Sequence, residues 1–161
     1  NSATSMSLAA GMRCTLASPI WPRMTKGLTA SAIASKPDES LGQAKQKVIL
    51  ALYGFNNNDL ADELIKLAKK GVVVRVKIDT AKGAEKKTGA LIGRLKSGGV
   101  EVQTVAPGGR NHNKFAVIDG SRVLTGSYNW TVKAESNWES LLVIDCAELA
   151  KSYESEWEKV H

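Results

Sequence analysis

The residues best suited to chemistry lie in one stretch, residues 111–130, which reads NHNKFAVIDGSRVLTGSYNW. It contains His112, one of two histidines in the chain, and Lys114 two positions later. Residues i and i+2 of a strand share a face, so we expect these two side chains to point the same way. A cation on an apolar strand is costly unless its face is solvated or an anion binds there. The spacing therefore indicates a solvated face or an anion site that includes an imidazole.

Further polar residues extend this pattern. Asp119 has the opposite parity and precedes Gly120, so we expect it to hold backbone or turn groups at a hairpin corner. Gly126 permits a close approach of backbones. Ser127 and Asn129 share a parity and could bring a hydroxyl and an amide to one site. Each of these features alone has a structural explanation. Six residue types at fixed spacing favour a functional explanation. The six are His112, Lys114, Asp119, Gly126, Ser127 and Asn129.

The surrounding sequence predicts the elements that position these residues. Apolar, β-branched runs predict strands at 12–17, 48–55, 72–79, 100–105, 112–119, 122–127 and 139–145. Apolar residues at helical spacing predict helices at 60–70, 88–99 and 147–160, and Asn58 or Asp59 is the expected N-cap of the first. Residues 82–87 are expected to form a charged loop. Alternating strands and helices indicate parallel strands with crossover helices, and the DGS turn indicates a hairpin. The fold class predicted is α/β, with a mixed, mostly parallel central sheet flanked by helices.

Composition divides the chain in two. The 161 residues suit one domain, and 43% hydrophobic and 24% charged residues are ordinary for a globular protein. Residues 1–36 hold four basic residues and no acidic one, which accounts for most of the net charge of +6. Residues 37–161 form the expected catalytic domain, which is only mildly basic, so global charge is weak evidence for nucleic acid.

The N-terminal segment, residues 1–36, has several interpretations. Its Ser, Ala and Thr content is typical of a targeting remnant, a partly ordered first strand or a mature N-terminus. An exported (periplasmic) or organellar (mitochondrial) location is favoured over a cytosolic one. Cys14 and Cys146 could form a disulfide or remain free thiols. No apolar run approaches the length that spans a bilayer.

The stretch 111–130 resembles the HKD signature of the phospholipase D superfamily. The residues that match it are His112, Lys114, Asp119, Gly126, Ser127 and Asn129. The resemblance extends over about residues 40–161, and this part of the sequence is similar to small members of the family that have a single motif. It implies a phospholipase D-like fold with one motif per chain.

The resemblance also implies a mechanism that uses no metal ion and no organic cofactor. A histidine attacks phosphorus and forms a phosphohistidine, while a second histidine protonates the leaving oxygen and then activates water. His112 is accordingly expected to be nucleophile or acid/base, and Lys114 and Asn129 to grip the phosphate. Ser127 is expected to donate a further hydrogen bond. Glu139 either holds the other ring nitrogen of His112 or is a solvated strand end.

A single motif predicts a homodimer. Two histidines are needed, and the other histidine, His161, is the last residue and lies outside any motif. A two-fold axis that brings two copies of His112 together supplies the pair.

The expected substrate is nucleic acid, DNA or RNA, cut by a non-specific endonuclease. Four basic residues expected near the motif end of the sheet could bind its backbone: Lys82, Lys86, Lys87 and Arg110. The alternative is a phospholipid (cardiolipin-type) hydrolase, which is less favoured because large apolar loops are not evident apart from Ile20 and Trp21. A structural or nucleic-acid-binding member without turnover is a third alternative.

Overall fold

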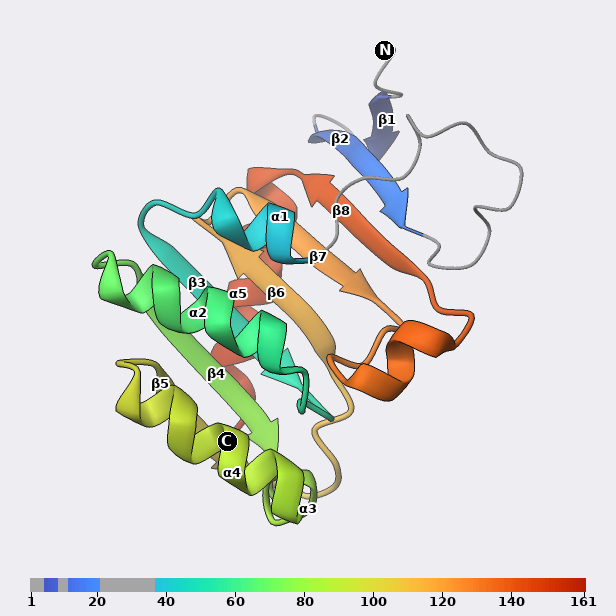
Figure 1. Cartoon of the computed structure of the whole chain (residues 1–161). Helices are drawn as coiled ribbons and strands as arrows, with labels where there is room; N and C mark the ends of the chain where they lie inside the picture. Colours follow the sequence, from blue (N-terminus) through green and yellow to red (C-terminus); the bar gives the residue numbers. More distant parts are fainter. Residues whose placement is uncertain (1–4, 9–11, 21–36) are drawn as a thin grey trace.

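The computed structural model describes the backbone of residues 5–8, 12–20 and 37–161, and the side chains of residues 37–161 (Figure 1). The strands are β1 (Ser5–Leu8), β2 (Met12–Ile20), β3 (Lys47–Leu52), β4 (Val73–Asp79), β5 (Glu101–Val105), β6 (Lys114–Ile118), β7 (Arg122–Gly126) and β8 (Leu141–Asp145). The helices are α1 (Pro37–Gly42), α2 (Asn58–Lys69), α3 (Thr80–Gly83), α4 (Lys86–Ser97), the 3-10 helix η2 (Val132–Ser136) and α5 (Ala147–Lys159).

The described strands form one mixed sheet in the order β1-β2-β8-β7-β6-β3-β4-β5. The pairs β3–β4 and β4–β5 are parallel, and every other pair of neighbours is antiparallel. The predicted mixed sheet flanked by helices is confirmed. The description "mostly parallel" holds only for β3, β4 and β5. Strand β6 is antiparallel to β3, β7 is antiparallel to β6, and β8 is antiparallel to β7.

Helices cover both faces of the sheet, and the central strands are therefore apolar throughout (Figure 1). In β3, Leu50 and Leu52 pack in the core beneath α2 and α4, whereas Ile49 and Ala51 pack in the second core against α5. Helix α5 contacts β3, β6 and β7. Its Trp157 donates its indole N–H to the carbonyl of Leu50 at 2.9 Å, which fixes the helix on the sheet.

Most predicted elements are found, with differences at their ends. The N-cap of α2 is Asn57, not Asn58 or Asp59, because the Asn57 side chain accepts the N–H groups of Asp59 and Leu60. The expected charged loop at 82–87 is partly helical, since α3 ends at Gly83 and α4 already begins at Lys86. The strand expected at 112–119 begins only at Lys114, so His112 lies just before it.

The hairpin between β6 and β7 is confirmed, and its turn is tight. Asp119 and Gly120 have φ of 51° and 63°, and Ser121 donates its N–H to the carbonyl of Ile118 at 3.1 Å. Positive φ at both central residues is the mark of a type I′ turn, whose twist matches the flanking strands. The Asp-Gly pair therefore fixes the register of the motif strands.

The N-terminal segment contributes two described strands to the sheet. The strand expected at 12–17 lies within β2, which pairs antiparallel with β8. The targeting interpretation and the side chains of Cys14, Ile20 and Trp21 lie outside the described residues. None of the helices among the described residues combines the length and the hydrophobicity that a membrane-spanning helix needs.

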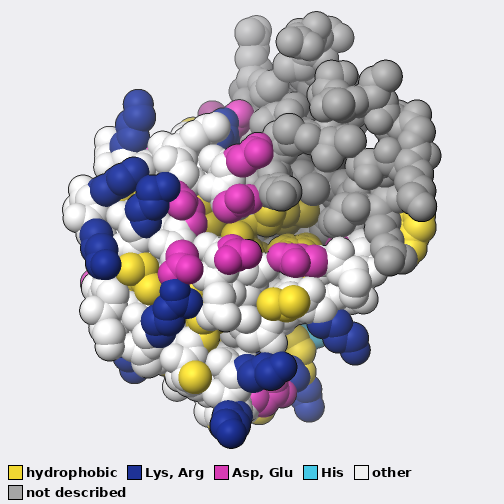
Figure 2. Space-filling model, viewed as in Figure 1, with side chains coloured by type: hydrophobic (Ala, Val, Ile, Leu, Met, Phe, Trp, Pro, Cys, Tyr) yellow, Lys and Arg dark blue, Asp and Glu magenta, His cyan; other side chains and the backbone are white. Residues whose placement is uncertain are grey.

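Surface charge on the visible face of the molecule is mixed. Figure 2 shows Lys and Arg side chains interspersed with Asp and Glu over the helices of that face. Helix α2 also carries an ion pair between Lys66 and Glu63. This face is therefore not a uniform basic surface.

Candidate active site

His112 and Lys114 meet at the start of β6, as their spacing predicts. The Lys114 Nζ lies 3.2 Å from His112 Nδ1 and 2.9 Å from the His112 carbonyl oxygen, to which it donates. His112 is exposed and Lys114 is half-buried. Burial lowers the pKa of Lys114, and the negative charge of Glu139 partly opposes that shift. An imidazole and an ammonium group thus share one accessible position.

A tyrosine that the sequence analysis did not select packs against this pair. The rings of Tyr53 and His112 lie 4.5 Å apart between centroids, with an interplanar angle of 55°. Tyr53 follows β3 directly, and its backbone N–H donates to the carbonyl of Asn113 at 2.8 Å. The end of β3 therefore forms one wall of the site.

Buried Asn111 fixes the segment that carries His112. Its side-chain amide donates to the carbonyl of Leu52 at the end of β3 and to that of Lys77 in β4, both at 3.3 Å. Its backbone N–H donates to Asp79 at 3.0 Å. Asn111 and Asp79 are only 1% and 3% exposed. Since a buried polar group without partners is costly, this set of bonds holds the segment in one position.

Asp119 lies at the other end of β6, where it holds backbone groups. Its carboxylate accepts the N–H groups of Lys45, Gln46 and Lys47, each at 2.9 Å. Partial burial would raise the pKa of Asp119, but these three bonds and the charge of Lys45 lower it below its usual value. The carboxylate thus anchors the segment before β3 and does not touch His112.

Gly126 lies where β7 meets the start of β8. A Cβ on Gly126 would be 2.0 Å from the Ser140 oxygen and 2.7 Å from its carbonyl carbon. No side chain fits in that space. The glycine of the motif therefore lets Ser140 approach and brings the neighbouring Glu139 to the site.

Ser127 and Glu139 are hydrogen-bonded to each other. The Ser127 hydroxyl donates to Glu139 Oε2 and accepts the N–H of Ser140 at 3.0 Å. Glu139 Oε1 also accepts from Asn137 at 3.2 Å. Among residues 37–161, no hydrogen bond joins Glu139 to His112, so the first of the two roles left open for Glu139 is not seen there.

Asn129 faces the same end of β3 as Tyr53. Its Oδ1 is buried close to Gly54, 3.9 Å from the position that a Cβ added to this glycine would take. This oxygen accepts no hydrogen bond from the described residues. Between Ser127 and Asn129, Tyr128 turns into the core, and burial raises its pKa to about 12. Tyr128 is thus buried between two less buried residues, and a shared site of Ser127 and Asn129 stays a prediction.

The four predicted substrate-binding residues separate into two pairs. Lys82 Nζ lies 5.3 Å and Arg110 Cζ 5.9 Å from the centroid of the Tyr53 ring. Lys86 and Lys87 are exposed at the start of α4, and in the described chain neither forms a hydrogen bond or ion pair with a motif residue. Only Lys82 and Arg110 thus reach the site itself.

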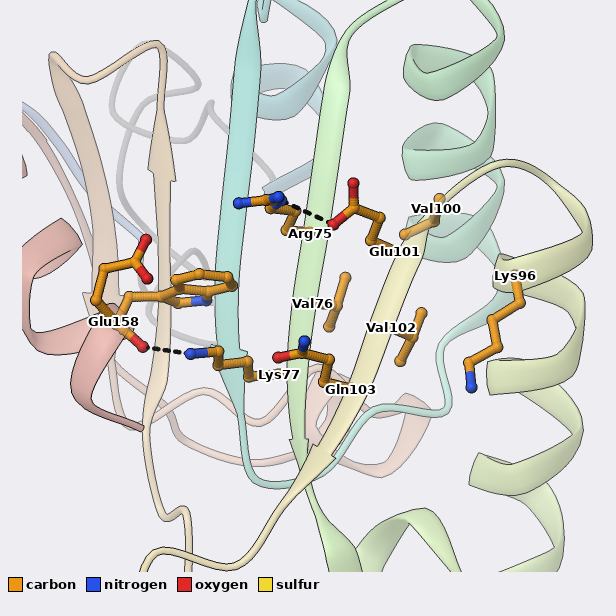
Figure 3. A pocket seen from close by; sticks show the side chains of 10 residues that line it. Arg75, Val76, Lys77, Lys96, Val100, Glu101, Val102, Gln103 and Glu158 are labelled. Atoms are coloured by element: carbon orange, nitrogen blue, oxygen red, sulfur yellow. Dashed lines mark hydrogen bonds and ion pairs between the residues drawn. The ribbon is translucent and has the colours of Figure 1, made fainter. Parts of the chain in front are cut away.

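A hollow of about 530 Å³ lies elsewhere, on the face of β4 and β5 beside the end of α5 (Figure 3). There Lys77 donates to the Trp157 carbonyl at 2.8 Å, with its Nζ 3.9 Å from the centroid of the Trp157 ring. Arg75 pairs with Glu101 at 2.8 Å. None of the motif residues lines this hollow, so it is not the site of the predicted chemistry.

Sequence reasoning missed Tyr53, Asn111, Asp79 and an apolar feature near the motif. Val132 and Trp138 are 58% and 68% exposed, in the segment between Asn129 and Glu139. These two exposed side chains add an apolar feature to the one expected at residues 20–21. Asn111 stands next to His112 in the sequence, and a polar residue before a strand was the available signal.

Comparison with known proteins agrees with this geometry. The family model described as "Cardiolipin synthase, PLD-like domain" matches residues 38–161. The chain is 40% identical over 133 residues to the mitochondrial cardiolipin hydrolase of Xenopus laevis, covering 82% of this chain and 62% of that protein. It is 31% identical over 120 residues to a phospholipase D of Rickettsia bellii, covering 74% and 59%. The chain thus spans less than two thirds of the length of these relatives.

Two solved structures share the fold. Nuc from Salmonella typhimurium, a phospholipase D family member, superposes with a TM-score of 0.72 at 24% identity, covering 77% of this chain and 86% of that one. NucT from Helicobacter pylori superposes with a TM-score of 0.67 at 26% identity, covering 76% and 82%. The predicted phospholipase D-like fold is confirmed.

Proposed function

This chain belongs to the phospholipase D superfamily, and from that premise we propose that it is a phosphodiesterase needing no metal ion, an endonuclease without sequence preference. The observation that carries the proposal is the placement of Lys114 Nζ 3.2 Å from His112 Nδ1 at an exposed position. A nucleophile and a cation at one point are what attack on an anionic phosphodiester requires.

The proposed reaction has two steps. His112 attacks phosphorus, a P–N bond forms, and the P–O bond to the leaving group breaks as a second imidazole gives that oxygen a proton. The second imidazole then takes a proton from water, which attacks phosphorus and breaks the P–N bond. Lys114 and Asn129 neutralise charge on the non-bridging oxygens during both steps. Ser127 bonds to Glu139, so we assign it to positioning that carboxylate.

The second imidazole is proposed to come from another copy of the chain. His161 is exposed at the last position, outside the motif, whereas His112 is exposed at the site. A two-fold axis beside His112 places the two rings face to face and forms one composite site per homodimer.

Nucleic acid is the proposed substrate because cations converge on the site. Lys82, Arg110 and Lys114 all lie within 6 Å of the Tyr53 ring. Such a local group of cations favours a polyanionic strand. The names of the two structural neighbours, Nuc and NucT, are consistent with this choice.

A phospholipid hydrolase is the second candidate, and a specific observation favours it. Val132 and Trp138 are exposed beside the motif, where they could enter a lipid interface. Several relatives bear the name mitochondrial cardiolipin hydrolase. Those relatives also support an organellar location, which a fluorescent fusion of the chain tests by microscopy.

An assay in EDTA separates the candidates. The purified protein is given single-stranded DNA, RNA and cardiolipin vesicles, beside His112→Asn as the inactive control. We expect cleavage of nucleic acid that survives chelation and is lost in the variant. Cleavage of lipid alone supports the second candidate, and cleavage of neither supports a binding protein without turnover. Loss of activity with EDTA would contradict the metal-independent mechanism.

A further inference from the structure

Tyr53 is surrounded by positively charged groups from three separate segments. Arg110 comes from the connection between β5 and β6, Lys82 from α3 and Lys114 from the start of β6. Their charged groups lie 5.9, 5.3 and 5.5 Å from the centroid of the ring. The face of an aromatic ring attracts each of these cations. The fold therefore gathers more positive charge around Tyr53 than the phosphate at His112 requires.

The charges around Tyr53 are incompletely neutralised. Lys82 pairs with Glu85 at 2.6 Å. Arg110 donates to the Tyr53 hydroxyl at 2.5 Å, and within residues 37–161 neither Arg110 nor Lys114 forms an ion pair with a carboxylate. The hydrogen bond and charge of Glu85 raise the pKa of Lys82 on balance, although the charge of Arg110 opposes this. An anion near Arg110 and Lys82 would relieve their mutual repulsion.

The cations fall into two groups along the ring. Lys114 contacts His112 directly and serves the phosphate that is cleaved. Arg110 is held instead at the hydroxyl end of Tyr53, where a guanidinium fixed by one bond keeps other N–H groups available for two oxygens of a phosphate. Tyr53 acts as the spacer, since His112 packs against the same ring.

We propose that Arg110 and Lys82, held against Tyr53, form a subsite for a second phosphate, the neighbour of the cleaved phosphate along a nucleic-acid strand. This inference rests on the proposed nuclease function and adds a preference to it. A substrate with a phosphate on the correct side of the scissile bond is bound at two points. A substrate with the scissile phosphate alone is bound at one.

Dinucleotides with a single cleavable bond test the subsite. The three substrates are TpT, pTpT and TpTp, assayed in EDTA at physiological salt. One of the two phosphorylated dinucleotides should show a kcat/KM about tenfold or more above that of TpT, since one charge-assisted contact has that effect. The other should show a much smaller gain.

Variants assign the preference to its residues. Arg110→Met should remove most of the advantage of the favoured dinucleotide, and Arg110→Lys should restore part of it. Arg75→Met is the matched control, because Arg75 pairs with Glu101 beside the distant hollow, and it should leave the advantage intact. If Arg110→Met does not fold, judged by circular dichroism, Lys82→Met provides the same comparison.

The outcomes separate this inference from the proposed function. Cleavage of all three dinucleotides at similar rates, or equal gains for pTpT and TpTp, overturns the subsite and leaves the nuclease standing. An advantage that survives both Arg110→Met and Lys82→Met also overturns it. Failure to cleave any nucleic acid overturns the nuclease, and the subsite with it.

Discussion

Asp119 shows how one charge positions the motif without touching the chemistry. Its carboxylate accepts three consecutive backbone N–H groups, from Lys45, Gln46 and Lys47, and its φ of 51° begins the hairpin turn. These bonds favour the ionised form, and despite partial burial they lower the pKa of Asp119. A group with a lowered pKa in the folded state contributes stability above its unfolded pKa, which is lost as the pH falls through the folded pKa.

Asp119→Asn should therefore destabilise the protein in a pH-dependent way. Asparagine tolerates the positive φ, so the variant removes the charge and leaves the turn in place. At pH 7 we expect a loss of about 1–2 kcal/mol in the free energy of unfolding. The difference from wild type should shrink as the pH falls below about 4.

Urea unfolding between pH 3 and 8 measures this effect. Asp62→Asn is the control, because the Asp62 carboxylate forms only an exposed ion pair with Arg94 and is expected to change stability by less than about 1 kcal/mol. A difference between Asp119→Asn and wild type that does not vary with pH would contradict the assigned role of the charge.

Asn111→Ala should weaken both the fold and the site. The substitution leaves the carbonyls of Leu52 and Lys77 without their donor, so we expect a loss of about 1–3 kcal/mol. In an assay, kcat should fall more than KM changes, because His112 loses its position. Asn58→Ala is the control, since exposed Asn58 accepts one side-chain bond from Arg94 away from the motif, and an equal effect in both variants would argue against a special role for Asn111.

At this scale, spacing alone predicted part of the site. The shared side of His112 and Lys114 follows from two residues along an extended chain. Tyr53 could not be found that way, since it lies 59 positions from His112 and meets it only once β3 pairs with β6. Of the two roles left open for Glu139, the bond to His112 is not formed within residues 37–161, because the carboxylate accepts from Ser127 and Asn137.

The start of β8 passes against the end of β7, and a missing side chain allows this. The carbonyl oxygen of Ser140 occupies the space of a Cβ on Gly126. Ser127 donates its N–H to that same oxygen at 2.9 Å. The close pairing of β7 and β8 therefore places Ser127 and Glu139 next to each other.

Two glycine substitutions with opposite expected effects test this arrangement. Gly126→Ala should destabilise by at least about 3 kcal/mol, because backbone must move to admit the methyl group. Gly93→Ala should stabilise by about 0.5–1 kcal/mol, since Gly93 lies within α4 with nothing within 4 Å of an added Cβ. Thermal unfolding of both variants gives the comparison, and a Gly126→Ala variant as stable as wild type would refute the close approach.

Strands and helices were largely predictable from periodicity, whereas their neighbours in the sheet were not. The Asp-Gly turn specified the hairpin β6–β7 locally. The pairing of β8 with β2 joins residues far apart in the sequence and follows from the whole sheet. For that reason the parallel region of the sheet was predicted to be larger than it is.

One motif lies in the 161 residues of this sequence, and the proposed assembly follows from that. A phosphohistidine mechanism needs two imidazoles, and His112 is the one that lies at the site.

The exposed side chains of Val132 and Trp138 lie in the segment between Asn129 and Glu139. If they contact lipid, Trp138→Ala should reduce cleavage of cardiolipin vesicles by about tenfold, because an aromatic side chain is lost from the interface. Cleavage of oligonucleotides should not change, and an equal loss on both substrates would contradict a lipid-specific role.

Mixed dimers test the central claim most directly. Wild-type chains and His112→Asn chains carry different affinity tags, are co-expressed, and are purified through both tags. If both copies of His112 work at one composite site, the mixed dimer has no activity above that of the His112→Asn homodimer, while a doubly tagged wild-type dimer is fully active. A mixed dimer with about half the wild-type activity would show that each chain works alone, and would contradict the account.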